Sequence, residues 1–155
     1  MKLLFKQRIF SWFDSYDIYD EDGNTVFTVE GRLAWGHKLE VSDRNGFHIA
    51  TLKEEVLTFM PKFEIYINGS YVGLIKKNFR LFEQSFDVDF CGWSVEGDFV
   101  GWDYKIYSGD NIVATVEKVL FKWSDTYEIN IENDKDALGA LMVILAIDAE
   151  KCSRN

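Results

Sequence analysis

Short runs in which hydrophobic and polar side chains alternate recur over most of the chain. In "FEIYI" at 63–67, every second residue is Phe or Ile, and the residues between them are Glu and Tyr. In "TVFTVEGRL" at 25–33, Phe27 and Val29 fall on one face, opposite mostly polar residues. A period of two residues is that of a pleated strand, whose side chains point alternately to opposite faces. The pattern therefore predicts β-strands with one buried face.

Four segments repeat one hairpin pattern, at 16–29, 38–52, 63–75 and 104–116. Each starts with an aromatic residue or Leu, a charged residue and Ile or Val, and then reaches a turn rich in Gly, Asn and Asp. Such turns adopt positive φ easily, so each segment is typical of a β-hairpin. Propeller blades are an alternative for a repeated unit, but only about two strands fit each one. We therefore expect a long antiparallel meander of about twelve strands.

The alternation stops near residue 131, and the chain then reads "DALGALMVILAIDA" at 136–149. Ala, Leu and Met favour a helix, and Asn133 or Asp134 would cap its start. The eleven residues between Asp136 and Asp148 have no charged or polar side chain. As a helix they would span about 16 Å, whereas a bilayer core needs about 30 Å. A helix that is apolar on every face, yet too short to span a membrane, is expected to be buried in protein.

A closed sheet provides such an interior. About twelve strands, spaced about 4.8 Å apart and tilted about 40°, close into a barrel about 24 Å across, and inward side chains leave roughly the width of one helix. The predicted fold is thus mainly β, a closed antiparallel barrel around a central hydrophobic C-terminal α-helix. The helix residues expected to form its core contacts are Leu138, Leu141, Met142, Ile144 and Leu145.

Composition narrows the class of protein. The 155 residues suggest a single domain over 1–155, and 13 Phe, 7 Tyr and 5 Trp suit a wide core. A net charge of −9 opposes binding to nucleic acid. Cys91 and Cys152 form neither a disulfide framework nor a metal motif, and the N-terminus has no signal-peptide hydrophobic region. We expect a cytoplasmic protein that does not span a membrane.

Further segments carry a family pattern: "FKQRIFSWFDSYDIYDEDGNTVFTVEG" at 5–31, "GHKLEV" at 36–41, "PKFEIYINGSYVGLIKKNF" at 61–79, "WSVEGDFVGWDYKI" at 93–106 and "FKWSDTYEI" at 121–129. With the closing apolar run, they resemble the LURP-one-related family, including its small bacterial YxjI-like members, within the Tubby C-terminal-like superfamily. The resemblance implies the same twelve-stranded barrel around a helix. The superfamily also includes phosphoinositide-binding Tubby domains and phospholipid scramblases, so family membership alone fixes no function.

Catalytic and metal chemistry has little support in the sequence. "DEDG" at 20–23 lacks the closing Glu of an EF-hand loop, because Gly31 stands at its twelfth position. His37 and His48 are the two histidines, and no G-x-S-x-G motif accompanies them. No glycine-rich nucleotide loop and no zinc spacing occur. We therefore expect neither an enzyme nor a bound cofactor or metal.

The best basic cluster lies in "KKNFR", with Lys76, Lys77 and Arg80, and Lys118 and Lys122 hold comparable places in a related hairpin. These side chains are candidates for binding a phosphate or lipid headgroup, and ordinary solvated strand charges are the alternative. The predicted function is a non-catalytic binding or scaffold protein with an unidentified protein or lipid ligand. The alternative is a phospholipid-headgroup binding protein. In either case the site is expected on the outer wall or the loops.

Overall fold

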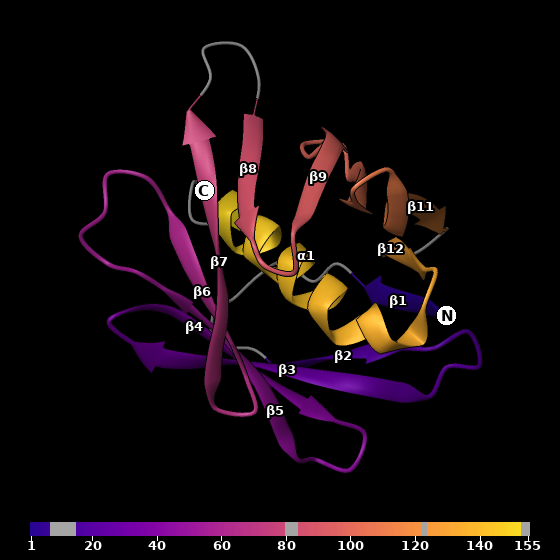
Figure 1. Cartoon of the computed structure of the whole chain (residues 1–155). Coiled ribbons are helices and arrows are strands. Elements are labelled where there is room, and N and C mark those ends of the chain that lie inside the picture. The colour runs from indigo at the N-terminus through magenta and orange to yellow at the C-terminus, as the bar shows by residue number, and fades with distance from the viewer. Residues whose placement is uncertain (7–14, 80–83, 122–123, 153–155) are drawn as a thin grey trace.

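A computed structural model describes residues 1–6, 15–79, 84–121 and 124–152. It contains one antiparallel sheet of twelve strands, curved around a C-terminal helix (Figure 1). The strands are β1 (Lys2–Lys6), β2 (Ser15–Tyr19), β3 (Thr25–Ala34), β4 (Gly36–Asp43), β5 (His48–Glu54), β6 (Lys62–Ile67), β7 (Ser70–Phe79), β8 (Gln84–Asp89), β9 (Trp93–Asp98), β10 (Asp103–Ser108), β11 (Asn111–Phe121) and β12 (Ser124–Ile131). A 3-10 turn, η1 (Asp134–Asp136), leads into α1 (Ala137–Cys152).

The strands follow one another as a meander, and the N-terminal strand joins β2 to β12. The sheet order is β8-β7-β6-β5-β4-β3-β2-β1-β12-β11-β10-β9, so β1 pairs with both β2 and β12. The four predicted hairpins are β2–β3, β4–β5, β6–β7 and β10–β11. The prediction of a mainly β, twelve-stranded antiparallel barrel with one C-terminal helix is therefore confirmed.

The barrel is nearly closed rather than fully closed. Within the described residues, no hydrogen-bonded register joins β8 to β9, and the two strands diverge from their connecting turn in Figure 1. Aromatic rings fill this seam from inside: Phe86 packs edge-on against Phe99 at 5.1 Å, and Phe90 against Trp93 at 5.3 Å. These rings bury apolar area where a strand pair would otherwise form. The sheet thus keeps its two edge strands, β8 and β9, at this seam.

The helix fills the interior of the barrel. Leu141, Met142, Ile144 and Leu145 are at most 1% exposed, and Leu138 is partly buried against the same core. At Gly139 an added Cβ would lie 2.9 Å from the Phe90 ring, so a glycine is needed for this close approach. Because sheet side chains surround the helix on every face, its all-round apolarity is matched by its environment.

Asn133 caps the start of the helical region, as one of the two predicted capping residues. Its side chain accepts a hydrogen bond from the Lys135 N–H at the start of the 3-10 turn, and α1 follows from Ala137. The helix extends past the apolar run and includes Asp148 and Glu150, which are also buried. No described helix is long and apolar enough to cross a bilayer.

The two ends of the barrel differ in what they carry. The entry end holds Met1, the end of β12 and the start of α1, and the Met1 amine donates to the Ile131 carbonyl at 2.9 Å. The loop end holds the β3–β4, β5–β6 and β9–β10 connections and the end of α1. There the Lys151 Nζ donates to the Val100 carbonyl at 3.2 Å. The last turn of α1 is thus tied to the β9–β10 connection of the wall.

The helix core gives a direct test of this arrangement. Leu141→Asp places a carboxylate where the side chain is 1% exposed, which costs several kcal/mol without a partner. We expect no folded, soluble protein from this variant. The matched control is Leu120→Asp on β11, where the side chain is 80% exposed, and it should express and fold as the parent does. A folded, soluble Leu141→Asp protein by circular dichroism and size exclusion would contradict a central helix.

Candidate functional site

The predicted basic pair on β7 divides between the two faces of the wall. Lys76 points outward, with its side chain 46% exposed and its Nζ 3.7 Å from an Asp87 carboxylate oxygen. Lys77 points into the barrel and is 4% exposed, and its Nζ donates to Glu150 Oε1 at 2.7 Å. Neighbouring strand residues face opposite ways, so these two ammonium groups do not act on one outer surface.

The other predicted cations do not join them. Arg80 and Lys122 lie outside the described residues. Lys118 is exposed on β11, opposite Tyr127 of β12. Even by the shorter way, across the β8–β9 seam, β8, β9 and β10 lie between the strand of Lys76 and that of Lys118. The structure therefore leaves Lys76 as the one described residue of "KKNFR" with its charge on the outer wall.

Two sets of buried polar groups lie inside the barrel at the end of α1. One is the Lys77–Glu150 pair; the other is Asp148 and Tyr104, whose Oδ2 and hydroxyl are buried without a hydrogen-bond partner. Burial raises the pKa of the Asp148 carboxyl to about 7, and Lys151 opposes the shift. Burial also raises the pKa of Tyr104, with Asp148 adding to the effect. Burial thus disfavours the charged form of the Asp148 carboxyl inside an otherwise apolar core.

Aromatic rings pack beside Tyr104 at the loop end. Trp102 stacks on Tyr127 at 4.0 Å and also packs near Tyr104, with ring centroids 6.3 Å apart. The Lys151 Nζ lies 4.3 Å from the centre of the Trp102 ring. Trp102 is only 5% exposed. Tyr104 is therefore part of the packed core, and the Lys77–Glu150 ion pair connects the helix end to β7.

The "DEDG" segment forms the predicted hairpin turn between β2 and β3. Asp20 Oδ1 accepts hydrogen bonds from the backbone N–H groups of Asp22, at 3.0 Å, and Asn24, at 2.8 Å. These bonds lower the pKa of the Asp20 carboxyl, Asn24 contributing most. Its oxygen is thus engaged by the turn itself. No group of three or more possible metal ligands occurs among residues 1–6, 15–79, 84–121 and 124–152.

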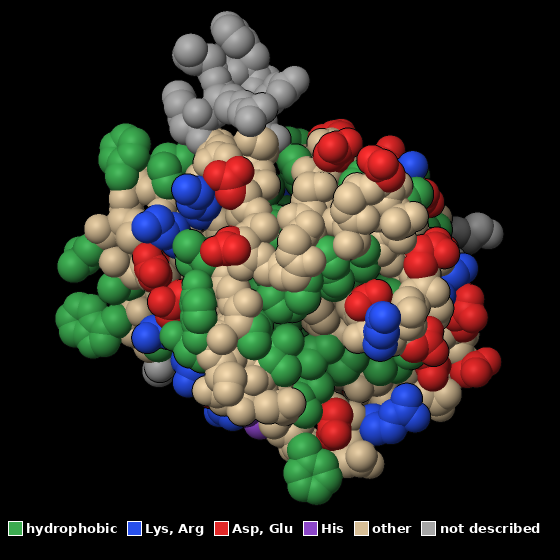
Figure 2. Space-filling view, in the orientation of Figure 1, with side chains coloured by type: hydrophobic (Ala, Val, Ile, Leu, Met, Phe, Trp, Pro, Cys, Tyr) green, Lys and Arg blue, Asp and Glu red, His purple; other side chains and the backbone are tan. Residues whose placement is uncertain are grey.

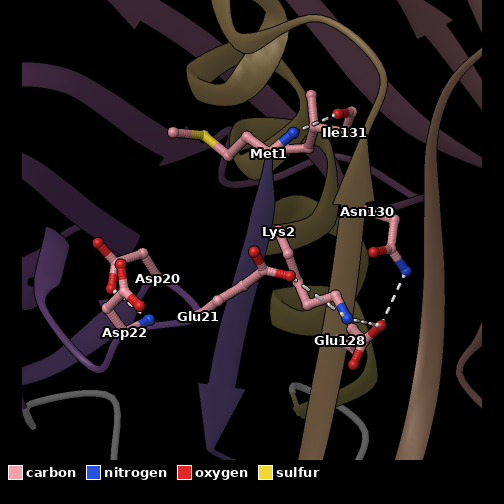
Figure 3. Close-up of polar contacts among 8 residues, drawn as sticks. All are labelled: Met1, Lys2, Asp20, Glu21, Asp22, Glu128, Asn130 and Ile131. Atoms are coloured by element: carbon pink, nitrogen blue, oxygen red, sulfur yellow. Dashed lines mark hydrogen bonds and ion pairs between the residues drawn. The ribbon is translucent and has the colours of Figure 1, made fainter.

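Near that turn, polar contacts fasten β1 at the entry end (Figure 3). Lys2 Nζ lies 2.9 Å from Glu128 Oε1 on β12 and 3.6 Å from Glu21 Oε1. The Glu128 carboxylate raises the pKa of the Lys2 ammonium. Asn130 also donates to Glu128, at 3.1 Å. These contacts connect β1 to strands from both ends of the chain, so their role here is structural.

The two histidines lie at opposite ends of the barrel. At the loop end, the His37 Nδ1 contacts Glu54 Oε2, which also accepts the His37 backbone N–H at 3.0 Å. His48 lies beside the β4–β5 turn, and its Nε2 is 2.8 Å from Thr51 Oγ1. A histidine beside a carboxylate is one part of a hydrolytic triad. Because the second histidine is at the other end, the two cannot serve one site.

The loop end carries a different feature, exposed hydrophobic side chains. We call Trp35, Leu57 and Phe59 the apolar tips, and they are 89%, 103% and 99% exposed. They come from the β3–β4 and β5–β6 connections, and Figure 2 shows hydrophobic side chains standing out singly from that edge. Basic and acidic side chains lie close behind them. Further exposed apolar residues of the loop end are Val56, Val100 and Leu120.

Comparison with known proteins shows the family of this chain. A family model for LURP-one-related proteins matches residues 1–148. The chain belongs to the LURP-one-related family. The uncharacterized protein YxjI of Bacillus subtilis (strain 168) is 28% identical over 149 residues, which cover 96% of this chain and 92% of YxjI. An Arabidopsis thaliana protein solved by X-ray crystallography has a TM-score of 0.65 at 19% identity, over 95% of this chain and 89% of that one. The latter likeness shows a shared fold.

Two features of this family member escaped the sequence reasoning. Alternation along β7 places Lys77 on the same face as Ile75, and that signal was available. Its partner could not be predicted from the sequence, because Glu150 is 73 residues away. The apolar tips lie in connections, where no periodic pattern marks whether a side chain is buried. Exposure of Trp35 and Phe59 became visible only with the fold.

The Lys77–Glu150 pair predicts a specific pattern of stability. Lys77→Met leaves a buried carboxylate without its partner and should lower the free energy of unfolding by about 3–5 kcal/mol. The double variant Lys77→Met/Glu150→Leu removes both charges and should recover most of that loss. Lys76→Met, on the outer wall, should cost less than about 1 kcal/mol. Urea denaturation measures all three, and equal stability of the two single variants would contradict the buried pair.

Proposed function

We propose that this LURP-one-related protein is a non-catalytic binding protein that contacts its partner through the loop end of the barrel. The interior supports this view because α1 fills it: residues from Ala140 to Ile147 are at most 1% exposed. Small-molecule sites are usually open concave pockets. A barrel filled by its own helix offers its outer wall and connections for binding.

The apolar tips are the observation that carries the proposal. Single exposed hydrophobic residues are common on protein surfaces, but several on adjoining connections form a candidate interaction surface. Here Trp35, Leu57 and Phe59 come from two connections that touch. Gly36 has a φ of +87°, and an added Cβ there would lie 2.7 Å from Val56 Cγ1. The tips therefore belong to one surface, which a partner would remove from water.

The geometry of the titratable groups favours binding over catalysis. His37 and Glu54 connect the start of β4 to the end of β5, a position in which they hold the two tip-bearing connections together. Asp148 and Glu150 lie within the packed core. We infer that these groups stabilise the fold, and that the protein acts as a binding or scaffold component.

A second candidate is binding of phospholipid headgroups, which the outward position of Lys76 favours. Lys62 lies opposite Lys76 in the β6–β7 register, so two ammonium groups adjoin on the outer wall near the loop end. Residence in the cytoplasm and avoidance of nucleic acid stay predictions from composition. The same holds for the single domain over 1–155.

A matched pair of phenylalanines tests the proposed binding surface. A photoreactive phenylalanine analogue at position 59 probes the loop end, and the same analogue at position 47 probes the β4–β5 turn, where Phe47 is 68% exposed. After irradiation in the native cells, we expect protein or lipid adducts from position 59 and few from position 47. Mass spectrometry identifies them. Adduct yields from position 59 no higher than from position 47 would contradict binding at the loop end.

A further inference from the structure

The apolar tips protrude instead of packing against one another. Each of Trp35, Leu57 and Phe59 is close to fully exposed, so none lies flat on the barrel wall. A folded protein partner would need a separate pocket for each protruding side chain. The interfacial region of a bilayer accepts such side chains at any spacing, and Trp is enriched there. The shape of this surface therefore suits insertion into the interfacial region of a bilayer better than docking on a folded protein.

A set of basic residues lies directly behind the tips on the outer wall. Arg32 of β3 is in register with Lys38 of β4, which is in register with Lys53 of β5. Carboxylates partly balance two of these cations in the free protein: Arg32 contacts Glu30 at 2.6 Å and Glu40 at 3.0 Å, and the Lys38 Nζ lies 2.9 Å from Glu40 Oε1. Lys62 of β6 and Lys76 of β7 face each other beside them. We call these five residues the cation belt: Arg32, Lys38, Lys53, Lys62 and Lys76.

Outward acidic residues lie further from the tips along the same strands. Glu30 precedes Arg32 on β3, Glu40 follows Lys38 on β4, and Glu64 follows Lys62 on β6. In each case the carboxylate is two residues, or about 7 Å, further from the loop end. Along each of β3, β4 and β6, the order is thus apolar tips, then cations, then anions.

Anions also lie at the level of the cation belt, and one of them, Glu64, is in register with Lys53. Glu55 is 3.6 Å from Lys62, and Asp87 is 3.7 Å from Lys76. Both belt lysines are still more than a third exposed. The net charge of −9 repels an anionic surface from most directions, so the protein should approach it with this end first.

We propose that the loop end docks on an anionic lipid bilayer, with the apolar tips entering the interfacial region and the cation belt meeting the headgroup phosphates. Lys38 is three residues from Trp35, which is about 10 Å along an extended strand. When the Trp35 tip is inserted, the cations would therefore lie about that far behind it, at the level of the headgroups. Basic side chains near an anionic leaflet are attracted to it. This inference rests on the proposed function, for which it names the partner.

Vesicle flotation of the purified full-length protein tests the inference. Phosphatidylcholine vesicles with phosphatidylserine should carry the protein upward, and vesicles without phosphatidylserine should carry less of it. Trp35→Ser/Leu57→Asn/Phe59→Ser should reduce flotation about tenfold or more, because the apolar contacts are lost. Asn suits position 57, where φ is +64°. Lys53→Glu/Lys62→Glu should also reduce flotation, and added salt should weaken binding by the parent protein.

The matched control removes apolar side chains from the entry end. Phe47→Ser/Tyr71→Ser changes residues that are 68% and 55% exposed, and it should float like the parent. All variants should keep the parent's thermal midpoint, because the changed side chains are exposed. Absence of flotation, or equal flotation of the tip variant and the parent, would overturn the inference. Protein adducts from position 59 without vesicle binding would overturn it while leaving the proposed function standing.

Discussion

Burial of an apolar helix inside a curved sheet is the interaction on which this structure depends. The helix has no polar face, so it cannot lie on a surface, and the sheet has an inner face of large side chains that needs a filling. Each is the other's hydrophobic partner, from Phe63 and Ile65 on β6 to Leu141 and Ile144 on α1. Neither element has a plausible folded state alone.

That constraint decides where function can lie. The helix occupies the interior, and the seam between β8 and β9 is filled by Phe86, Phe90 and neighbouring rings. The buried polar groups around Glu150 join the helix end to the wall. What remains for a partner is the outside, where the side chains of Trp35, Leu57 and Phe59 are close to fully exposed at the loop end. We therefore propose that recognition lies in the connections, as is common for folds with rigid scaffolds.

Much of the fold could be predicted because it follows from the period of the hydrophobic pattern and from the length of the apolar run. Alternation gave the strands and hairpins, and an eleven-residue run without a polar side chain indicated a buried helix. The candidate site was less accessible. Lys76 and Lys77 looked like one basic cluster, although strand alternation separates them. Glu150 completes a pair with a residue 73 positions away, and the tips at Leu57 and Phe59 belong to a connection without periodicity. Such features depend on tertiary contacts.

Native-state hydrogen exchange tests the central position of the helix most directly. If α1 is enclosed by the sheet, its amides from Leu141 to Asp148 exchange only when the whole barrel unfolds. Their opening free energy should then equal the global free energy of unfolding and match that of β4 and β5. Faster exchange of these helix amides, while the strand amides stay protected, would show that the helix can leave an intact barrel and would contradict the account.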